Sequence, residues 1–105
     1  MLRRRAALAA ALDARLAAVD VLALPTVPVV PPPIAPMLAD DDLYMRTNQL
    51  VLRNTMIANF FDLTSISLPI PGAALPAGFM LIARNGRDRD LLAMAAAVEA
   101  ALGQT

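Results

Sequence analysis

The sequence predicts an α/β fold of about three strands with flanking helices, and three observations lead to this class. Ala- and Leu-rich stretches near both ends of the chain have the spacing of amphipathic helices. Two short apolar runs, and one run that alternates polar with apolar residues, have the lengths and patterns of strands. A stretch with several prolines separates the first strand from the helices that follow. With 105 residues, the chain is long enough for one domain at most.

The first helix is expected over residues 3–19 and the first strand over residues 21–24. The larger apolar residues of this helix recur at three- and four-residue intervals, so they share one face. They are Leu8, Leu12, Leu16 and Val19. Residues 21–24 include no polar position, which is typical of a strand buried on both faces, as in a parallel sheet. Pro25 ends this strand.

Residues 25–36 are expected to form an extended or polyproline-like loop, because proline fixes φ and lacks an N–H donor. Three consecutive aspartates, residues 40–42, suit the start of a helix, where carboxylates accept bonds from free backbone N–H groups. The helix is predicted over residues 42–52. The sequence Arg-Asn-Thr at residues 53–55 is expected to break it, and a short second helix then continues to residue 61.

Two further strands are predicted over residues 65–68 and 78–83, with a turn region between them. The first alternates serine with apolar residues, which indicates one buried face, whereas the second is apolar and more fully buried. The last helix begins at Asp88 as its cap and ends at Gly103. One face of it carries Leu91, Ala95, Val98 and Leu102. Three short strands are too few to close a sheet, so the fold is expected to be incomplete as a stand-alone domain.

The composition argues against several classes of function. Nine arginines balance nine acidic residues, and this zero net charge gives no reason to expect nucleic-acid binding. No uncharged apolar stretch is as long as a membrane-spanning helix, so we expect no membrane partner and a cytoplasmic location. The sequence contains no Cys, His or Lys, which removes disulfides, thiolates and the commonest general base. No metal site and no cofactor are predicted.

Three local features have functional interpretations that the residues themselves do not favour. Ser65 and Ser67 are the only serines, but no His or Lys is present to activate either as a nucleophile. The aspartates at 40–42 could attract a divalent cation, but consecutive carboxylates do not converge on one ion without a shaped loop. Residues 28–36 have the spacing of a polyproline ligand, but no basic residue closely flanks them.

Four stretches in chain order resemble the C-terminal end of the amidase-signature family. The first is Val19–Pro28, in which an apolar run enters Pro25-Thr26, and the second is Arg53-Asn54-Thr55, followed by Asn59 and Ile66–Pro69. The third is Leu75–Ile82. The fourth consists of Gly86, Asp88, Leu91-Leu92 and the Ala-rich helix that ends near Glu99. Asp62 and Thr64 stand where many family members have Gly and Pro, which bears on the subgroup rather than on membership.

The resemblance implies that residues 1–105 are a partial domain, the C-terminal portion of the family's mixed-sheet fold. Members hydrolyse or transfer amide nitrogen with a Ser nucleophile, a second Ser in a cis peptide and a Lys. Those groups belong to a Gly/Ser-rich segment that has no counterpart here, so no catalytic residue is assigned. The resemblance therefore implies a fragment of a hydrolase of carboxamide or urea-like C–N bonds, which is expected to be inactive alone.

The same resemblance points to two candidate residues for a substrate pocket, Thr26 and Asn59. The alternatives are that Thr26 only forms the turn and that Asn59 satisfies buried main chain. In the family, the turn after the strand that corresponds to residues 21–24 lies close to the substrate cleft. Loops beyond strand ends commonly shape such sites. The expected partner is the missing N-terminal part of the amidase, or a second copy of the chain. The alternative interpretation is a small stand-alone interaction protein that binds a partner through its apolar strands and helices.

Overall fold

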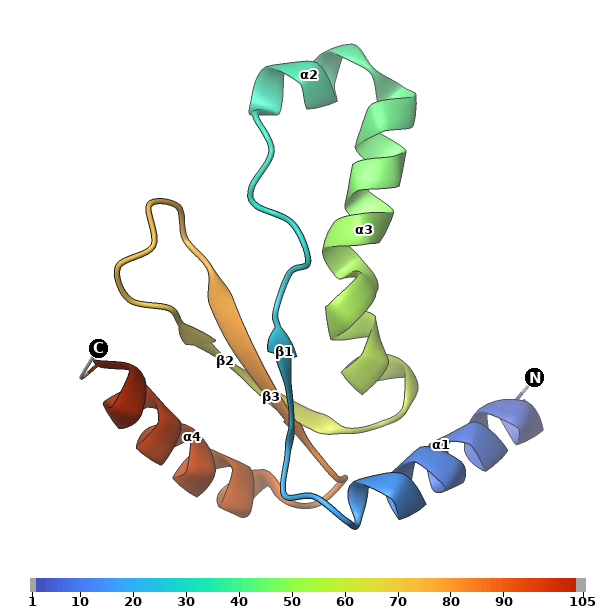
Figure 1. The fold of residues 1–105 in the computed structure, drawn as a ribbon. Helices are drawn as coiled ribbons and strands as arrows, with labels where there is room; N and C mark the ends of the chain where they lie inside the picture. Colours follow the sequence, from blue (N-terminus) through green and yellow to red (C-terminus); the bar gives the residue numbers. More distant parts are fainter. Residues whose placement is uncertain (1, 104–105) are drawn as a thin grey trace.

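The computed structural model describes residues 2–103, which form four helices and one three-stranded sheet (Figure 1). In chain order the elements are α1 (Leu2–Leu16), β1 (Leu22–Pro25), α2 (Ile34–Ala39), α3 (Asp41–Phe60), β2 (Thr64–Pro69), β3 (Gly78–Ala83) and α4 (Asp88–Gly103). The predicted α/β class and the three strands with flanking helices are confirmed.

The sheet has the order β1-β3-β2, and both neighbours run antiparallel to the central strand β3. Because side chains of a strand alternate between faces, β3 contributes to two separate cores. Leu81 and Ala83 pack with Leu68 of β2 and with the buried side of α4. Met80 and Ile82 pack on the opposite face against Ala58, near the end of α3. The predicted burial of β3 is thus confirmed.

The interpretation of residues 21–24 as a strand buried on both faces is wrong. β1 is an edge strand, antiparallel to β3, in which Leu22 and Ala23 are exposed and only Leu24 is half-buried. A run without polar residues indicates two-sided burial only when elements cover both faces. Here Val21 and Leu24 supply the apolar contacts of this segment to the two cores.

The predicted break in the middle helix is also wrong, because α3 continues through residues 53–55 as one helix of 20 residues. Both polar side chains that suggested the break are accommodated within the helix. The Thr55 hydroxyl donates to the carbonyl of Leu52 at 3.1 Å, a bond that a helical Thr makes to its own preceding turn. The Asn54 side chain points out of the helix and bonds elsewhere.

Aspartates stand at the starts of α3 and α4. Asp40 precedes α3, and its carboxylate accepts a bond from the backbone N–H of Leu43 at 3.0 Å. A short helix, α2, begins at Ile34, so the last three residues of the predicted irregular stretch are helical and the helix continues to Ala39. The predicted cap Asp88 lies inside α4 as its first residue, because the first backbone bond of the helix runs from the N–H of Leu91 to the carbonyl of Arg87. Leu91 and Ala95 are buried on the predicted apolar face.

Helix α1 is joined to the rest of the molecule by a few specific contacts. Leu16 is buried, and the Arg84 guanidinium forms two hydrogen bonds with the Asp13 carboxylate, at 2.9 and 2.8 Å. At the other end of the helix, Arg5 donates to the carbonyl of Phe60 at 2.8 Å and lies over its ring. The hydrogen bond from Arg84 holds the pKa of Asp13 below its ordinary value, and partial desolvation opposes this shift.

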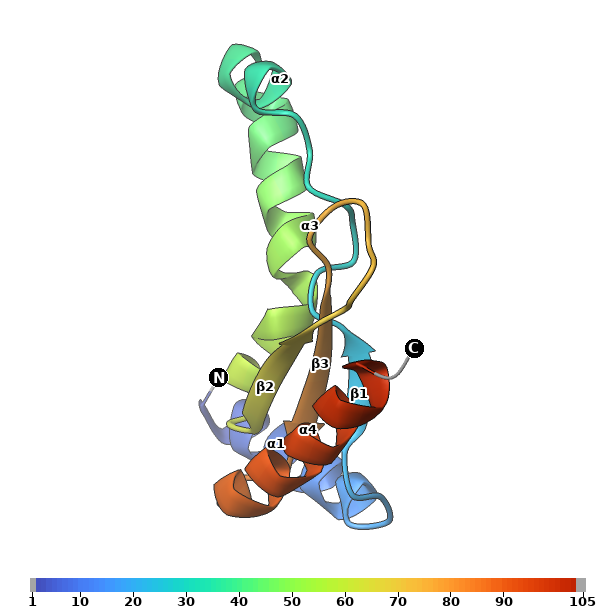
Figure 2. The same cartoon turned by 90° about the vertical axis from the view of Figure 1, so that its left-hand side faces the viewer.

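The molecule is open rather than compact. Figure 2 shows α2 and the adjoining part of α3 extending well beyond the sheet. The radius of gyration is 16.1 Å, whereas a compact domain of this length has about 13 Å. The accessible surface is 7663 Å². A compact monomer of 11.1 kDa exposes about 5,700 Å², so about 2,000 Å² of additional surface lies open.

Candidate functional site

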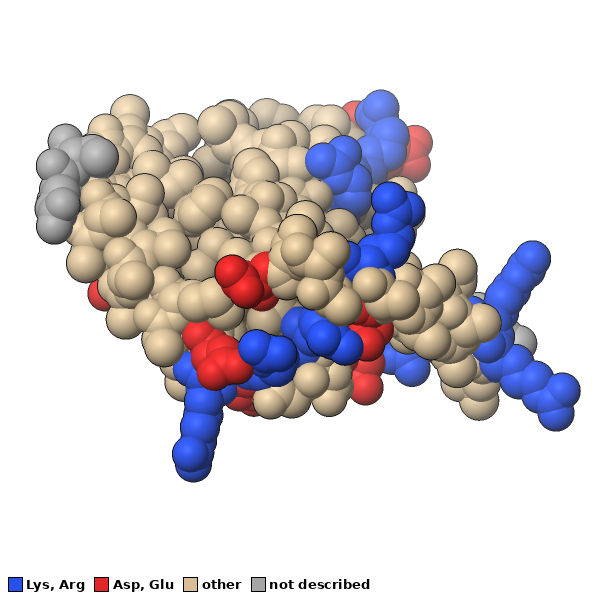
Figure 3. Space-filling view, turned by 60° about the horizontal axis from the view of Figure 1, so that its bottom comes forward, with Lys and Arg blue, Asp and Glu red and all other residues tan. Residues whose placement is uncertain are grey.

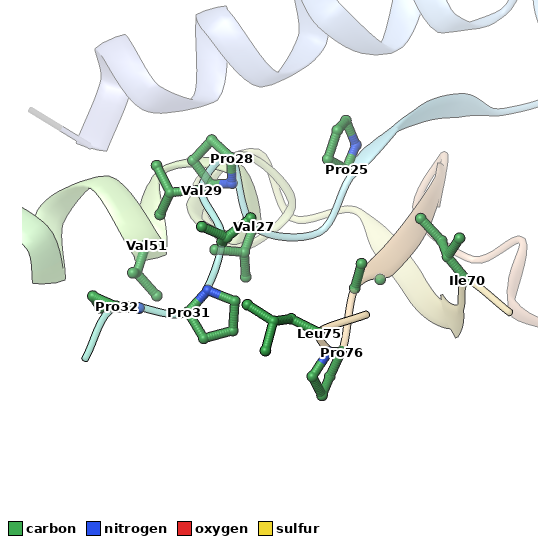
Figure 4. A pocket seen from close by; sticks show the side chains of 13 residues that line it. Pro25, Val27, Pro28, Val29, Pro31, Pro32, Val51, Ile70, Leu75 and Pro76 are labelled. Carbon is green, nitrogen blue, oxygen red and sulfur yellow. The ribbon is translucent and has the colours of Figure 1, made fainter. Parts of the chain in front are cut away.

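An apolar cleft opens between the proline loop and the loop that joins β2 to β3 (Figure 4). Its volume is about 480 Å³, within the range of small-molecule sites. The proline loop supplies Pro25 and residues 27–32, and Val51 of α3 completes that wall. Ile70 and residues 75–78 form the opposite wall. Figure 4 labels Val27 and Pro31 on the first wall and Leu75 on the second.

Thr26 lies at the base of the proline loop, where it joins the three strands. Its backbone N–H donates to the carbonyl of Gly78 at 3.0 Å, which continues the ladder between β1 and β3. Its hydroxyl shares a hydrogen bond of 2.5 Å with the hydroxyl of Ser67 in β2. The two hydroxyls meet across the central strand because residue 78 has no side chain there. A Cβ at this position would lie 2.5 Å from the Thr26 hydroxyl oxygen and 2.6 Å from that of Ser67.

Asn54 fixes the other side of the loop base. Its amide nitrogen donates to the carbonyl of Pro25 at 2.8 Å, and its carbonyl oxygen accepts from Arg53 at 3.3 Å. Among the described residues, Asn54 is the one polar residue that is buried, with 6% of its surface exposed. This bond ties α3 to the end of β1 at the entrance of the proline loop. The proline loop is therefore held from β2 through Thr26 and from α3 through Asn54.

A second, smaller hollow adjoins the apolar cleft. It shares Pro32 and Val51 with the cleft. The other residues that line it are Met37, Tyr44, Thr47 and Asn48. The surface that faces this hollow is almost entirely apolar, so the polar atoms of Tyr44, Thr47 and Asn48 contribute little to it. Tyr44 is exposed, which leaves the hollow accessible from solvent.

The two residues predicted for a substrate pocket lie in different places. Thr26 is half-buried and lies between the lining residues Pro25 and Val27, but it is not itself among the residues that line the cleft. Asn59 is exposed in the last turn of α3, where its backbone carbonyl accepts a 3.5 Å bond from Arg5, and it does not line the cleft. Asn54, rather than Asn59, makes the bond near the cleft. Sequence reasoning missed it, although it precedes the buried Ala58 by four residues and therefore shares its helical face.

Charged groups are absent from the described lining of the cleft. The shifted pKa values belong to the pair Asp13 and Arg84, which bridges α1 and the end of β3 and does not line it. Within residues 2–103, no group of three or more Asp, Glu, His or Cys side chains is arranged to hold a metal ion. In the same range, no helix combines the length and apolarity needed to cross a membrane.

These features define a class of protein: an α/β chain with two apolar cores, open edges and a cleft, in which no nucleophile among residues 2–103 has a base beside it. The profile of the Amidase family matches residues 1–92. The chain belongs to this family.

Two relatives match over 88 residues each. The chain is 36% identical to the 2-amino-5-chloromuconic acid deaminase of Comamonas testosteroni, with 82% of this chain and 19% of the relative covered. It is 40% identical to a subunit of the glutamyl-tRNA(Gln) amidotransferase of Halobacterium salinarum, with 83% of this chain and 20% of the relative covered. The chain thus spans about a fifth of the length of these relatives. No solved structure matches it significantly.

Proposed function

We propose that the chain is the C-terminal segment of an amidase-signature hydrolase, which acts on a carboxamide or urea-like C–N bond. The observation that carries this proposal is the family match over residues 1–92, in a chain that spans about a fifth of its relatives. In this proposal the segment contributes the apolar cleft and the part of the sheet around it. The Ser nucleophile, the bridging Ser and the Lys come from another part of the domain.

The local chemistry supports inactivity of the 105 residues by themselves. Ser67 is bonded to the hydroxyl of Thr26, which is too weak a base to remove its proton. Ser65 lies on an exposed position of the same strand. The sequence has no His and no Lys to activate either hydroxyl. The chain therefore has no His to act as a base, and it lacks the Lys that the family's mechanism needs.

The open surface supports the remainder of the amidase domain as the partner. Interfaces that resemble a divided domain core bury about 2,000 Å² or more and are mostly apolar. That area is the total for both partners, or about 1,000 Å² from each, and the surplus of about 2,000 Å² on this chain alone exceeds this share. Large apolar side chains are exposed on α2, α3 and α4; examples are Ile34, Leu38, Met56 and Leu92. In the view of Figure 3, charged side chains gather in the lower and right-hand parts, and a broad uncharged area lies beside them.

A chimera tests the proposal. The 88 aligned residues of the Comamonas relative are replaced by those of this chain, and release of ammonia from 2-amino-5-chloromuconic acid and from a panel of simple amides is measured. We expect the chimera to hydrolyse at least one of these compounds and the 105-residue chain to hydrolyse none. Hydrolysis by the isolated chain that disappears on Ser67→Ala would contradict the proposal, as would a folded chimera without activity on any compound.

A further inference from the structure

Helix α3 carries large apolar residues on the side that faces away from the sheet. Asn54 and Ala58 are buried on the side that packs against it. Leu52 and Met56 each stand two residues from one of these buried positions, which is about half a turn of an α-helix. Met45 and Phe60 extend the same row at intervals of seven and four residues. Between 42% and 55% of each of these four residues is exposed, and we call them the outer stripe.

The two ends of the outer stripe lie near clusters of opposite charge. Three exposed aspartates, residues 40–42, stand at the start of α3, and three exposed arginines, residues 3–5, stand at the start of α1. The arginines lie near the other end of α3, because Arg5 donates to the carbonyl of Phe60 at 2.8 Å and lies over its ring. Figures 1 and 2 both show the start of α1 near the end of α3 and far from its beginning.

We infer that the 105-residue chain forms a two-fold symmetric dimer in which the outer stripes of two copies pack antiparallel. In a two-fold interface the same surface supplies both sides. The antiparallel direction places Leu52 of both copies near the axis and Met45 of one copy beside Phe60 of the other, which is a favourable thioether–aromatic contact. The inference concerns the 105 residues by themselves and does not depend on the proposed function.

Charge selects the antiparallel direction. In this arrangement the arginines at the start of α1 in each copy come close to the aspartates at the start of α3 in the other. A parallel pair would instead place the two aspartate clusters beside each other, and like charges across an interface are unfavourable. The net charge of the chain is zero, so two copies do not repel one another as whole molecules.

The exposed surface is large enough for such a dimer. A standard interface buries about 800 Å² from each partner, and this chain exposes about 2,000 Å² more than a compact monomer of its mass. The outer stripe contains no charged residue, and Gln49, which stands between Met45 and Leu52, is also uncharged. Its two methionines are flexible and adapt to the shape of an opposing surface.

Sedimentation of the full chain tests the dimer. We expect a mass of about 22 kDa, twice that of the 11.1 kDa chain. Leu52→Asp places two carboxylates near the axis, and we expect it to raise the dissociation constant at least about tenfold. Leu92→Asp, on the exposed side of α4, is the matched control and should leave the dimer intact. Circular dichroism verifies that each variant is folded, and Met56→Asp replaces Leu52→Asp if the latter is not.

Cross-linking tests the direction of the helices. The sequence contains no Cys, so a single introduced thiol reacts alone. In the antiparallel pair, residue 49 of one copy faces residue 56 of the other. We therefore expect a short bis-maleimide, added to an equimolar mixture of Gln49→Cys and Met56→Cys chains, to join mainly the two different variants. A tag on one of them distinguishes the products by mass.

Four results would overturn the inference. They are a monomer at every concentration, an assembly larger than a dimer, dissociation by Leu92→Asp as strong as by Leu52→Asp or Met56→Asp, and cross-links that join mainly identical variants. A dimer unchanged by both stripe substitutions would do so as well. None of these measurements involves hydrolysis, so a chimera without activity would contradict the proposed function and leave this inference standing.

Discussion

At the scale of single residues, Gly78 determines how closely the three strands approach. The Thr26 and Ser67 hydroxyls meet over this glycine, and no room remains for a methyl group. We predict that Gly78→Ala lowers the free energy of unfolding of the chimera by about 1–3 kcal/mol, as overpacking does elsewhere. Urea denaturation measures the change. Gly103→Ala is the control, because a Cβ there meets nothing within 4 Å. Equal stability of both variants would show that the sheet adjusts freely.

Asn54 is the second residue whose bond supports the cleft. Asn54→Ala removes the donor to the Pro25 carbonyl, and we expect a loss of about 0.5–1.5 kcal/mol in the unfolding free energy. Gln49→Ala, at an exposed position on the same helix, is expected to change stability by less than about 0.5 kcal/mol. Indistinguishable urea midpoints for the two variants would mean that the bond contributes nothing in solution.

Thr26 and Asn54 differ in how far the sequence reveals them. Thr26 is predicted as a site residue because the family resemblance places the turn after its strand close to the substrate cleft, and loops beyond strand ends commonly shape such sites. Asn54 stands in a segment whose composition favours a helix break, and its partner lies 29 residues earlier in the chain. A bond to a backbone carbonyl has no signature in the partner's side chain, so only the three-dimensional arrangement reveals it.

At the scale of elements, we expect the attachment of α1 to depend on pH. The Arg84 hydrogen bond keeps the pKa of Asp13 below its ordinary 3.8, so the ion pair stabilises the folded arrangement fully above that pH. This stabilisation is lost as pH falls through the lower pKa of the folded state. We expect amide exchange in α1 to accelerate in that acid range, and Asp13→Asn to show the fast exchange already at neutral pH. A carboxyl pKa at or above 3.8 by NMR would contradict this account.

The elements themselves could be predicted where side-chain pattern and burial coincide. The strand at 78–83 and the apolar face of α4 follow from apolar residues whose spacing matches the contacts they make. The helix break at 53–55 does not occur, because Thr55 bonds inside the helix and Asn54 bonds outside it. The short strand β1 is apolar without being enclosed, since its outer side is an open edge in the described chain.

At the scale of the whole molecule, the fold exposes more apolar surface than a chain of this size can leave open without consequence. Large exposed patches mark interfaces or promote association. We predict that the isolated chain is loose or oligomeric and binds hydrophobic dyes, because its edge strands and helical faces lack cover. Light scattering and dye fluorescence measure this. A monomer with sharp cooperative unfolding and no dye binding would show that the chain is self-sufficient.

The central claim is that this chain is one part of an amidase domain and is completed by the rest. The most direct test is co-expression with the portion of the Comamonas relative that lies outside the 88-residue match, followed by affinity purification through a tag on this chain. The account predicts a soluble complex of one copy of each, with the dye binding of the isolated chain abolished. Failure of the two pieces to co-purify in any ratio, with each soluble by itself, would contradict it.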